Sequence, residues 1–219
     1  MKKDIIVFSD FDGTITNKDV IISIMARFAP PIWKKILRDI LDEKTTITEG
    51  VSKLFQLIPS SKKEEILDWI LSNIKIREGF KDFLIFLNKH EIPFIVLSGG
   101  LDFYIYELLK PYKDLITYIY CNKADFTDKY IKVKFIYECN SICTKDCGMC
   151  KGSIIVKYPQ ELKIHIGDSI TDISAAKVAN IIFARGDLKN RLDKLGIRYI
   201  PFENFFDIKN QILKMIVVV

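Results

Sequence analysis

Three short runs of apolar, mostly branched residues constrain the fold of this chain more than any other feature of its sequence. They span residues 5–8 (IIVF), 94–97 (FIVL) and 164–166 (IHI), and each is followed directly by Ser or Gly. Such runs are typical of strands that are buried on both faces of a parallel sheet. Because stretches with helical spacing separate them, the sequence predicts an α/β protein with a Rossmann-like parallel sheet and helices on both faces.

The chain between the first two runs is too long for a simple crossover connection. A single crossover helix needs far fewer residues than the stretch from 14 to 98. Helical patterns fill this stretch, and prolines at positions 30, 31 and 59 interrupt them. We therefore expect an inserted all-helical cap after the first strand. The predicted units are a core domain of residues 1–15 and 76–219, a cap of residues 16–75 and, within the core, a hairpin with a Cys-rich loop over residues 121–150.

Composition excludes several classes of protein. The 219 residues are 49% hydrophobic and 28% charged, which is too apolar for a disordered chain and too charged for an integral membrane protein. The net charge of +5 is spread along the chain without a basic run, so we expect no nucleic-acid partner. Neither end carries an apolar stretch long enough for a signal peptide or a membrane helix. These features predict a cytoplasmic protein with no membrane partner, and they leave the oligomeric state unknown.

Two carboxylates follow the first apolar run at positions two apart. Asp10 and Asp12 would project to the same side of an extended segment, at the edge where open α/β sheets bind ligands. Carboxylates this close repel, so a cation must neutralise one or a proton must stay on the other. Either solution suits phosphoryl transfer, with Asp10 attacking phosphorus and Asp12 donating a proton to the leaving oxygen. Taken alone, the motif is explained equally well by a turn with an Asx cap.

The other two runs end in residues suited to phosphate and metal binding. Ser98 offers a hydroxyl, and the glycine after it leaves its backbone amide open to an anion. Asp168 could complete a magnesium site with Asp10 and the backbone carbonyl of Asp12, and Asp172 could support it. Each motif alone is explained as well by a turn or a helix cap, but three at one sheet edge are far less probable by chance. The predicted metal ligands are Asp10, Asp12, Asp168 and Asp172.

Together these motifs resemble those of the haloacid dehalogenase superfamily of aspartate-nucleophile phosphotransferases. Residues 10–14 (DFDGT), Ser98, Lys151 and residues 167–172 (GDSITD) are similar to its four motifs in chain order. The resemblance implies a magnesium-dependent phosphomonoester hydrolase, in which Asp10 is the nucleophile and Asp12 the acid and base. It also implies that the phosphate-binding residues are Thr14, Ser98, Gly99 and Lys151.

Longer segments are similar to a narrower group within the superfamily. Residues 28–33, 75–80, 90–94 and 120–122 look like segments of the methionine-salvage phosphatases that act on 2-hydroxy-3-keto-5-methylthiopentenyl-1-phosphate. The resemblance implies a small phosphorylated metabolite as the partner. Phosphoserine stays the alternative, although Asp19 stands where phosphoserine phosphatases typically carry Glu. The predicted cap contacts with substrate are Asp19 and Arg77, and further candidates are Met25, Phe28 and Trp33, for which packing between helices is the simpler explanation.

Four of the five cysteines lie close together, at Cys139, Cys143, Cys147 and Cys150. In a reducing compartment such a cluster favours structural Zn²⁺, with disulfides, free thiols or another metal as alternatives. A zinc site here would fix the loop that presents Lys151. The cluster also allows a function of another class, that of a non-catalytic zinc-binding interaction protein.

Overall fold

The protein forms a seven-stranded sheet with the strand order β4-β3-β2-β1-β5-β6-β7. Its structure is a computed structural model that describes residues 4–137 and 146–217. All neighbouring strands pair in parallel except β3 and β4, which are antiparallel. The predicted α/β class is confirmed. The strands are β1 (Ile5–Ser9), β2 (Phe94–Leu101), β3 (Tyr118–Asp125), β4 (Lys132–Lys134), β5 (Leu162–Gly167), β6 (Ile181–Ala184) and β7 (Ile200–Pro201).

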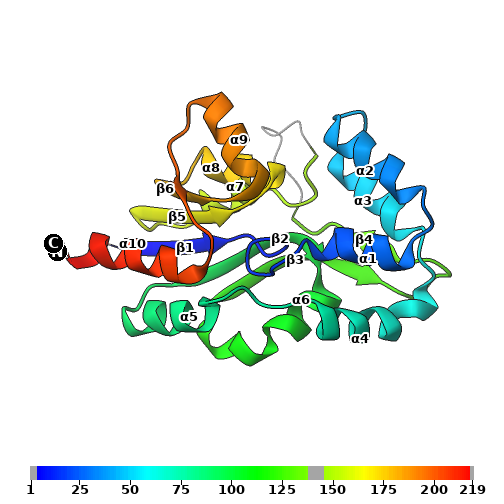
Figure 1. Cartoon of the computed structure of the whole chain (residues 1–219), viewed down its shortest axis with the longest axis horizontal. Coiled ribbons are helices and arrows are strands. Elements are labelled where there is room, and N and C mark those ends of the chain that lie inside the picture. The colour runs from blue at the N-terminus through cyan, green and yellow to red at the C-terminus, as the bar shows by residue number, and fades with distance from the viewer. Residues whose placement is uncertain (1–3, 138–145, 218–219) are drawn as a thin grey trace.

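Helices cover both faces of the sheet (Figure 1). One face packs against α5 (Phe80–Lys89), α6 (Asp102–Leu109) and α10 (Phe205–Val217). The other face packs against α7 (Lys151–Ile155), α8 (Ile173–Ala176) and α9 (Gly186–Leu195). Short 3₁₀ helices complete the connections, at η1 (Ser60–Lys62), η2 (Lys110–Leu115) and η3 (Ile170–Asp172).

An all-helical insertion follows β1, as the sequence predicts. Its helices are α1 (Val20–Phe28), α2 (Trp33–Leu41), α3 (Ile47–Phe55) and α4 (Lys63–Asn73). The side chains of Asp19 and Thr46 cap α1 and α3 by accepting hydrogen bonds from backbone amides of the first turn. Helix α4 lies beside α6, so the insertion shares a helical layer with the core (Figure 1). The division into a cap of residues 16–75 and a core of the remaining chain stays a prediction.

The insertion joins the rest of the protein through two paired segments. Asn17 N–H donates to the carbonyl of Lys75 at 2.9 Å, and Arg77 N–H donates to the carbonyl of Ile15 at 2.7 Å. Thr16 and Ile76 form the antiparallel bridge between these contacts. The outgoing and returning chains therefore support each other at the base of the insertion.

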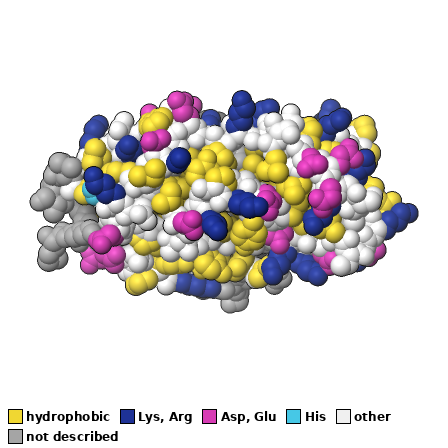
Figure 2. All heavy atoms as spheres, turned by 90° about the horizontal axis from the view of Figure 1, so that it is seen from below, with side chains coloured by type: hydrophobic (Ala, Val, Ile, Leu, Met, Phe, Trp, Pro, Cys, Tyr) yellow, Lys and Arg dark blue, Asp and Glu magenta, His cyan; other side chains and the backbone are white. Residues whose placement is uncertain are grey.

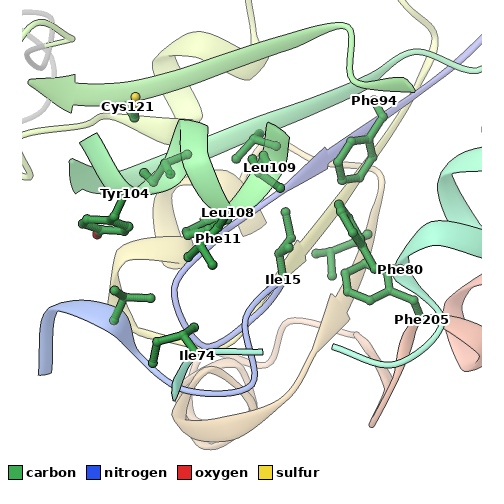
Figure 3. Close-up of a cluster of buried hydrophobic side chains, with 14 of the residues drawn as sticks. Phe11, Ile15, Ile74, Phe80, Phe94, Tyr104, Leu108, Leu109, Cys121 and Phe205 are labelled. Atoms are coloured by element: carbon green, nitrogen blue, oxygen red, sulfur yellow. The ribbon is translucent and has the colours of Figure 1, made fainter. Parts of the chain in front are cut away.

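The largest buried cluster fixes the segment that follows β1. Phe11 is fully buried in it, and Figure 3 shows its side chain beside Tyr104. Further along the same cluster, the ring of Phe80 lies 5.0 Å from that of Phe205 and 5.8 Å from that of Phe94. Because Phe11 is anchored in the core, the two aspartates beside it are held at the sheet edge.

The surface and the helix lengths bear on two other predictions. On the face drawn in Figure 2, the described Lys and Arg side chains are scattered among acidic and apolar ones. The lack of a nucleic-acid partner stays a prediction. Within residues 4–137 and 146–217, no helix is both long and apolar enough to cross a membrane.

Candidate active site

The three sequence motifs meet where β1, β2 and β5 end. These strands are neighbours in the sheet, and Ser9 pairs with Val96 on one side and Ile166 on the other. The residues at the carboxyl ends of these strands therefore lie side by side, at the end of the sheet that faces the inserted helices (Figure 1).

Asp10, Asp168 and Asp172 form an acidic group in which one carboxylate oxygen from each lies within 4.8 Å of the others. Burial raises the pKa of Asp10 well above its usual value, and burial followed by the charge of Asp172 raises the pKa of Asp168 to about 7. The hydroxyl of Thr14 donates to Asp168 Oδ1 at 3.1 Å. Carboxylates packed this closely call for a cation, and an all-oxygen donor set fits a hard ion such as Mg²⁺.

Lys151 supplies the positive charge beside this group. It begins α7, it is completely buried, and its Nζ donates to Asp10 Oδ1 at 2.5 Å and to Asp172 Oδ1 at 2.7 Å. Burial opposes the charge on Lys151, but the two carboxylates outweigh this effect and raise its pKa. The lysine therefore stays charged next to the predicted nucleophile.

His165 completes this network from the middle of β5. Its Nε2 lies 2.9 Å from Asp172 Oδ1, and burial lowers the pKa of the imidazole, so the ring is neutral. The other Asp172 oxygen accepts from the backbone amides of Asp168 and Ser169 at 3.0 and 3.1 Å. Burial alone would raise the pKa of Asp172, but Lys151 and His165 outweigh it and hold that pKa below its usual range.

The side chain of Asp12 lies apart from the acidic group. The predicted contact of Asp12 with the metal runs through its backbone carbonyl and stays a prediction. Asp12 Oδ2 accepts from the hydroxyl of Ser98 at 3.1 Å, and the hydroxyl of Tyr104 lies 3.2 Å from both carboxylate oxygens. Part of its surface stays open to solvent. Its packed surroundings, and then the charge of Asp19, raise the pKa of Asp12 well above its usual value. The side chain is therefore suited to hold a proton near neutral pH.

The four predicted phosphate-binding residues are brought to this edge, but not all of them face open space. Ser98 is buried and holds Asp12, while its Oγ accepts from the amide of Gly100 at 3.0 Å. The carbonyl of Gly99 accepts from Asn122 Nδ2 at 2.9 Å, and a side chain added at Gly99 would meet nothing within 4 Å. The backbone at Gly99 is thus open to a ligand.

Two predicted substrate contacts have different surroundings. Asp19 caps α1 and lies close enough to Asp12 to raise its pKa. Arg77 instead donates to backbone carbonyls of the segment after Asp12, from Nη2 to Gly13 and Thr16 at 2.7 and 2.9 Å and from Nε to Thr14 at 2.7 Å. This differs from the predicted contact with substrate. Arg77 lies where the chain returns from the insertion, so its donors reach the loop before they could reach a ligand.

The apolar candidates of the insertion pack between helices. Met25 is buried, Phe28 places its ring 5.9 Å from that of Trp69, and Trp33 packs against the main cluster. Helix packing, the simpler explanation given with these candidates, accounts for all three.

Two of the four clustered cysteines, Cys139 and Cys143, lie outside the described residues. Cys150 is buried directly before Lys151, and Cys147 is half-buried. The acidic group described above includes neither of them.

A cleft with a volume of about 820 Å³ lies between the α2–α3 part of the insertion and the core. The cleft reaches Thr171, whose hydroxyl lies 3.3 Å from Lys151 Nζ. The cleft therefore lies beside Lys151. Its lining includes Ile40, Lys44 and Ile47 from the insertion, and Cys147, Val156, Ile173, Lys177 and Val178 from the core.

Sequence reasoning missed Tyr104 and His165. The signal for His165 was present, because a single polar residue interrupts an otherwise apolar strand run. Tyr104 carries no such signal, since aromatic residues are ordinary on the buried face of a helix.

The parallel sheet, the helical insertion after β1 and the carboxylates at the strand ends define an α/β protein with the fold of phosphoserine phosphatases. A solved structure described as a phospho-aspartyl intermediate analogue of phosphoserine phosphatase matches with a TM-score of 0.71 and 22% identity over 99% of this chain and 100% of that chain. A substrate-bound phosphoserine phosphatase complex matches with a TM-score of 0.70 and 23% identity over 99% of both chains. These likenesses show the fold.

Sequence comparisons establish the family. The profile of the haloacid dehalogenase-like hydrolases matches residues 7–177. A 2-hydroxy-3-keto-5-methylthiopentenyl-1-phosphate phosphatase of Bacillus cereus (strain AH820) is 46% identical over 210 residues, or 94% of each chain. A protein of the same name from Geobacillus thermodenitrificans (strain NG80-2) is 41% identical over the full length of both. The chain belongs to the haloacid dehalogenase-like hydrolase family and is a phosphatase within it. The predicted family is confirmed, and the alternative of a non-catalytic zinc-binding protein gains no support.

Proposed function

We propose that this phosphatase hydrolyses 2-hydroxy-3-keto-5-methylthiopentenyl-1-phosphate, an ester of methionine salvage. The observation that carries the proposal is the identity of 41–46% to proteins of that name over 94–100% of the chain. The site supports the reaction class, because it combines a buried aspartate, a buried lysine and a second carboxyl with a raised pKa. Phosphoserine is the alternative substrate.

Asp10 acts as the nucleophile. One of its oxygens forms a bond to phosphorus while the ester P–O bond breaks, which gives an aspartyl-phosphate and the free alcohol. Lys151, whose Nζ lies 2.5 Å from Asp10 Oδ1, offsets the negative charge that gathers on the transferred phosphoryl group. The open backbone at Gly99, near the end of the neighbouring strand, would bind the phosphoryl oxygens, whereas the hydroxyl of Ser98 donates to Asp12.

Asp12 acts as the general acid and then as the general base. It gives its proton to the leaving oxygen in the first step and takes one from the attacking water in the second, which releases inorganic phosphate and restores Asp10. General acid and base catalysis of this kind is worth about a hundred- to ten-thousand-fold in rate.

Asp10, Asp168 and Asp172 are the side chains that would hold Mg²⁺, with Thr14 orienting Asp168. When bound, the ion supplies the positive charge that lets these carboxylates stay ionised beside a phosphate. Asp172 already accepts from Lys151, His165 and two backbone amides, so its main role is to orient Lys151 and Asp168.

The cleft beside Lys151 would take the organic part of the substrate. Ile40 and Ile47 from the insertion and Val156, Ile173 and Val178 from the core would bury a methylthio group. The amino group of phosphoserine would find less to pair with, because Asp19 is already engaged as the cap of α1. We keep as predictions a cytoplasmic location and a structural Zn²⁺ at the four clustered cysteines, which elemental analysis of the purified protein would test.

A panel assay tests the proposal. With Mg²⁺, we expect kcat/KM for the methionine-salvage ester to exceed that for phosphoserine at least about tenfold, since one buried apolar contact alone discriminates to this extent. Asp10→Asn should remain folded and lose more than about a thousandfold of the activity, while the exposed Asp114→Asn should change little. Activity that survives Asp10→Asn would refute the mechanism, and a preference for phosphoserine would refute the substrate.

A further inference from the structure

Tyr104 is a polar side chain buried next to the site that neither the sequence motifs nor the mechanism above uses. It is the third residue of α6, the helix that begins directly after β2, whose last residues include Ser98, Gly99 and Gly100, and it is completely buried. Its ring contacts Phe11 at 6.3 Å and Phe103 at 5.3 Å between centroids. Figure 3 shows it beside Phe11, the residue that separates the two catalytic aspartates in the chain.

The hydroxyl of Tyr104 is directed at Asp12. It lies 3.2 Å from Oδ1 and 3.2 Å from Oδ2, while the hydroxyl of Ser98 holds Oδ2 from a second direction at 3.1 Å. A buried phenol needs a hydrogen-bond partner, and here the partner is the carboxyl that transfers protons in the proposed mechanism. Burial and the charge of Asp12 raise the pKa of Tyr104 well above its usual value, so the hydroxyl keeps its proton and remains a donor.

The backbone next to this pair is shaped to accept it. A Cβ atom at Gly100 would lie 2.0 Å from the Tyr104 hydroxyl and 2.5 Å from Asp12 Oδ2. No side chain fits in that position, whereas a Cβ at the neighbouring Gly99 would meet nothing within 4 Å. The glycine at position 100 therefore makes room for the contact between Tyr104 and Asp12.

We propose that Tyr104 is a positioning residue that holds the Asp12 carboxyl in the orientation required for proton transfer to the leaving group. This inference rests on the proposed function. With Oδ2 fixed by Ser98, the bridging contact of Tyr104 to both oxygens restricts rotation of the carboxyl. The proton of Asp12 then stays directed at the ester oxygen. Tyr104 itself neither gains nor loses a proton, and it does not touch the phosphoryl group.

Substitution of Tyr104 by Phe removes only the hydroxyl. Its effect on proton transfer is measured as kcat/KM for aryl phosphates whose leaving groups differ in their need for a proton. A leaving group such as 2,4-dinitrophenolate departs without a proton, whereas phenolate departs only with help from an acid. Tyr104→Phe should lower kcat/KM for phenyl phosphate by about tenfold or more and that for 2,4-dinitrophenyl phosphate by less than about twofold. The matched control is Tyr106→Phe, because Tyr106 lies on the same helix and is 51% exposed. The control should leave both values unchanged.

The ratio of the two kcat/KM values decides the question even if part of the variant fails to fold, because the folded fraction cancels from the ratio. An unchanged ratio in Tyr104→Phe, or an equal change in Tyr106→Phe, would overturn the positioning role while leaving the proposed function intact. If the unsubstituted enzyme released phosphate from neither ester nor from the methionine-salvage substrate, the proposed function itself would fail, and this inference with it.

Discussion

Substitution of Arg77 by Met should destabilise the protein by loosening the loop that follows the catalytic aspartates. The guanidinium donates to the carbonyl oxygens of Gly13 and Thr16 from Nη2 and to that of Thr14 from Nε, at 2.7 to 2.9 Å. These carbonyls lie in the segment that carries Asp12 into the insertion. Met keeps much of the apolar stem of Arg and none of its donors.

The size of the loss follows from the hydrogen bonds. A bond from a charged donor contributes about 1.5–3 kcal/mol net. The carbonyl of Gly13 keeps a donor after the substitution, because Arg185 Nη1 also donates to it at 2.9 Å. The carbonyls of Thr14 and Thr16 lose the donor that Arg77 supplies. Since Arg77 is partly exposed, water replaces some of what is lost. We therefore expect a loss of about 3 kcal/mol, which lowers Tm by about 10 °C in a chain of this size.

Calorimetry and steady-state kinetics together check this prediction. Arg77→Lys should fall between the wild type and Arg77→Met, because it keeps the charge but not the planar set of donors. Arg198→Met is the control, since Arg198 is exposed. If Arg77 contacted the substrate instead, Arg77→Met would raise KM and leave Tm within about 1 °C of the wild type. That outcome would refute the structural role and restore the expectation drawn from the sequence.

Two further predictions concern the charges of the site. Lys151→Met leaves the carboxylates of Asp10 and Asp172 without the cation that they share. Steady-state kinetics should show kcat/KM lower by at least about a thousandfold. Urea unfolding should show the free energy of unfolding lower by about 3 kcal/mol. Unchanged stability would contradict the buried charge pairing. The pKa of Asp168 is raised to about 7, so the stability linked to it is present at low pH and lost as pH rises through that value. In EDTA, the free energy of unfolding should therefore fall by about 1 kcal/mol from about pH 6 to 8. Saturating Mg²⁺ should reduce that fall. Equal dependence of the unfolding free energy on pH with and without the ion would argue against this metal site.

The central strands could be predicted because burial on both faces leaves a continuous apolar run in the sequence. That signal weakens toward the sheet edges. Strand β7 has only two residues, and the burial of successive residues in β3 follows no regular alternation. Their places in the sheet depend on contacts with neighbouring strands, which no local pattern encodes.

The site could be predicted as far as its motifs follow strand ends, and no further. Because β2, β1 and β5 are adjacent parallel strands, Asp10, Ser98 and Asp168 lie at the same edge of the sheet, independently of the packing around them. The place of Arg77 depends instead on two segments about 60 positions apart in sequence that pair at the base of the insertion. The contact of Tyr104 depends on the direction in which α6 leaves the end of β2. Both are consequences of tertiary packing.

Packing also explains how two aspartates separated by a single residue can serve opposite purposes. Burial raises the pKa of both Asp10 and Asp12, yet a nucleophile must be ionised and a general acid must hold a proton. Phe11, anchored between them in the core, turns the two side chains toward different neighbours. Asp10 meets the charge of Lys151, which opposes the effect of burial, whereas Asp12 meets hydroxyl groups and the negative charges of Asp19 and Asp10. The division of labour therefore comes from the neighbours, and each substitution proposed above that removes one neighbour should impair one half of the reaction more than the other.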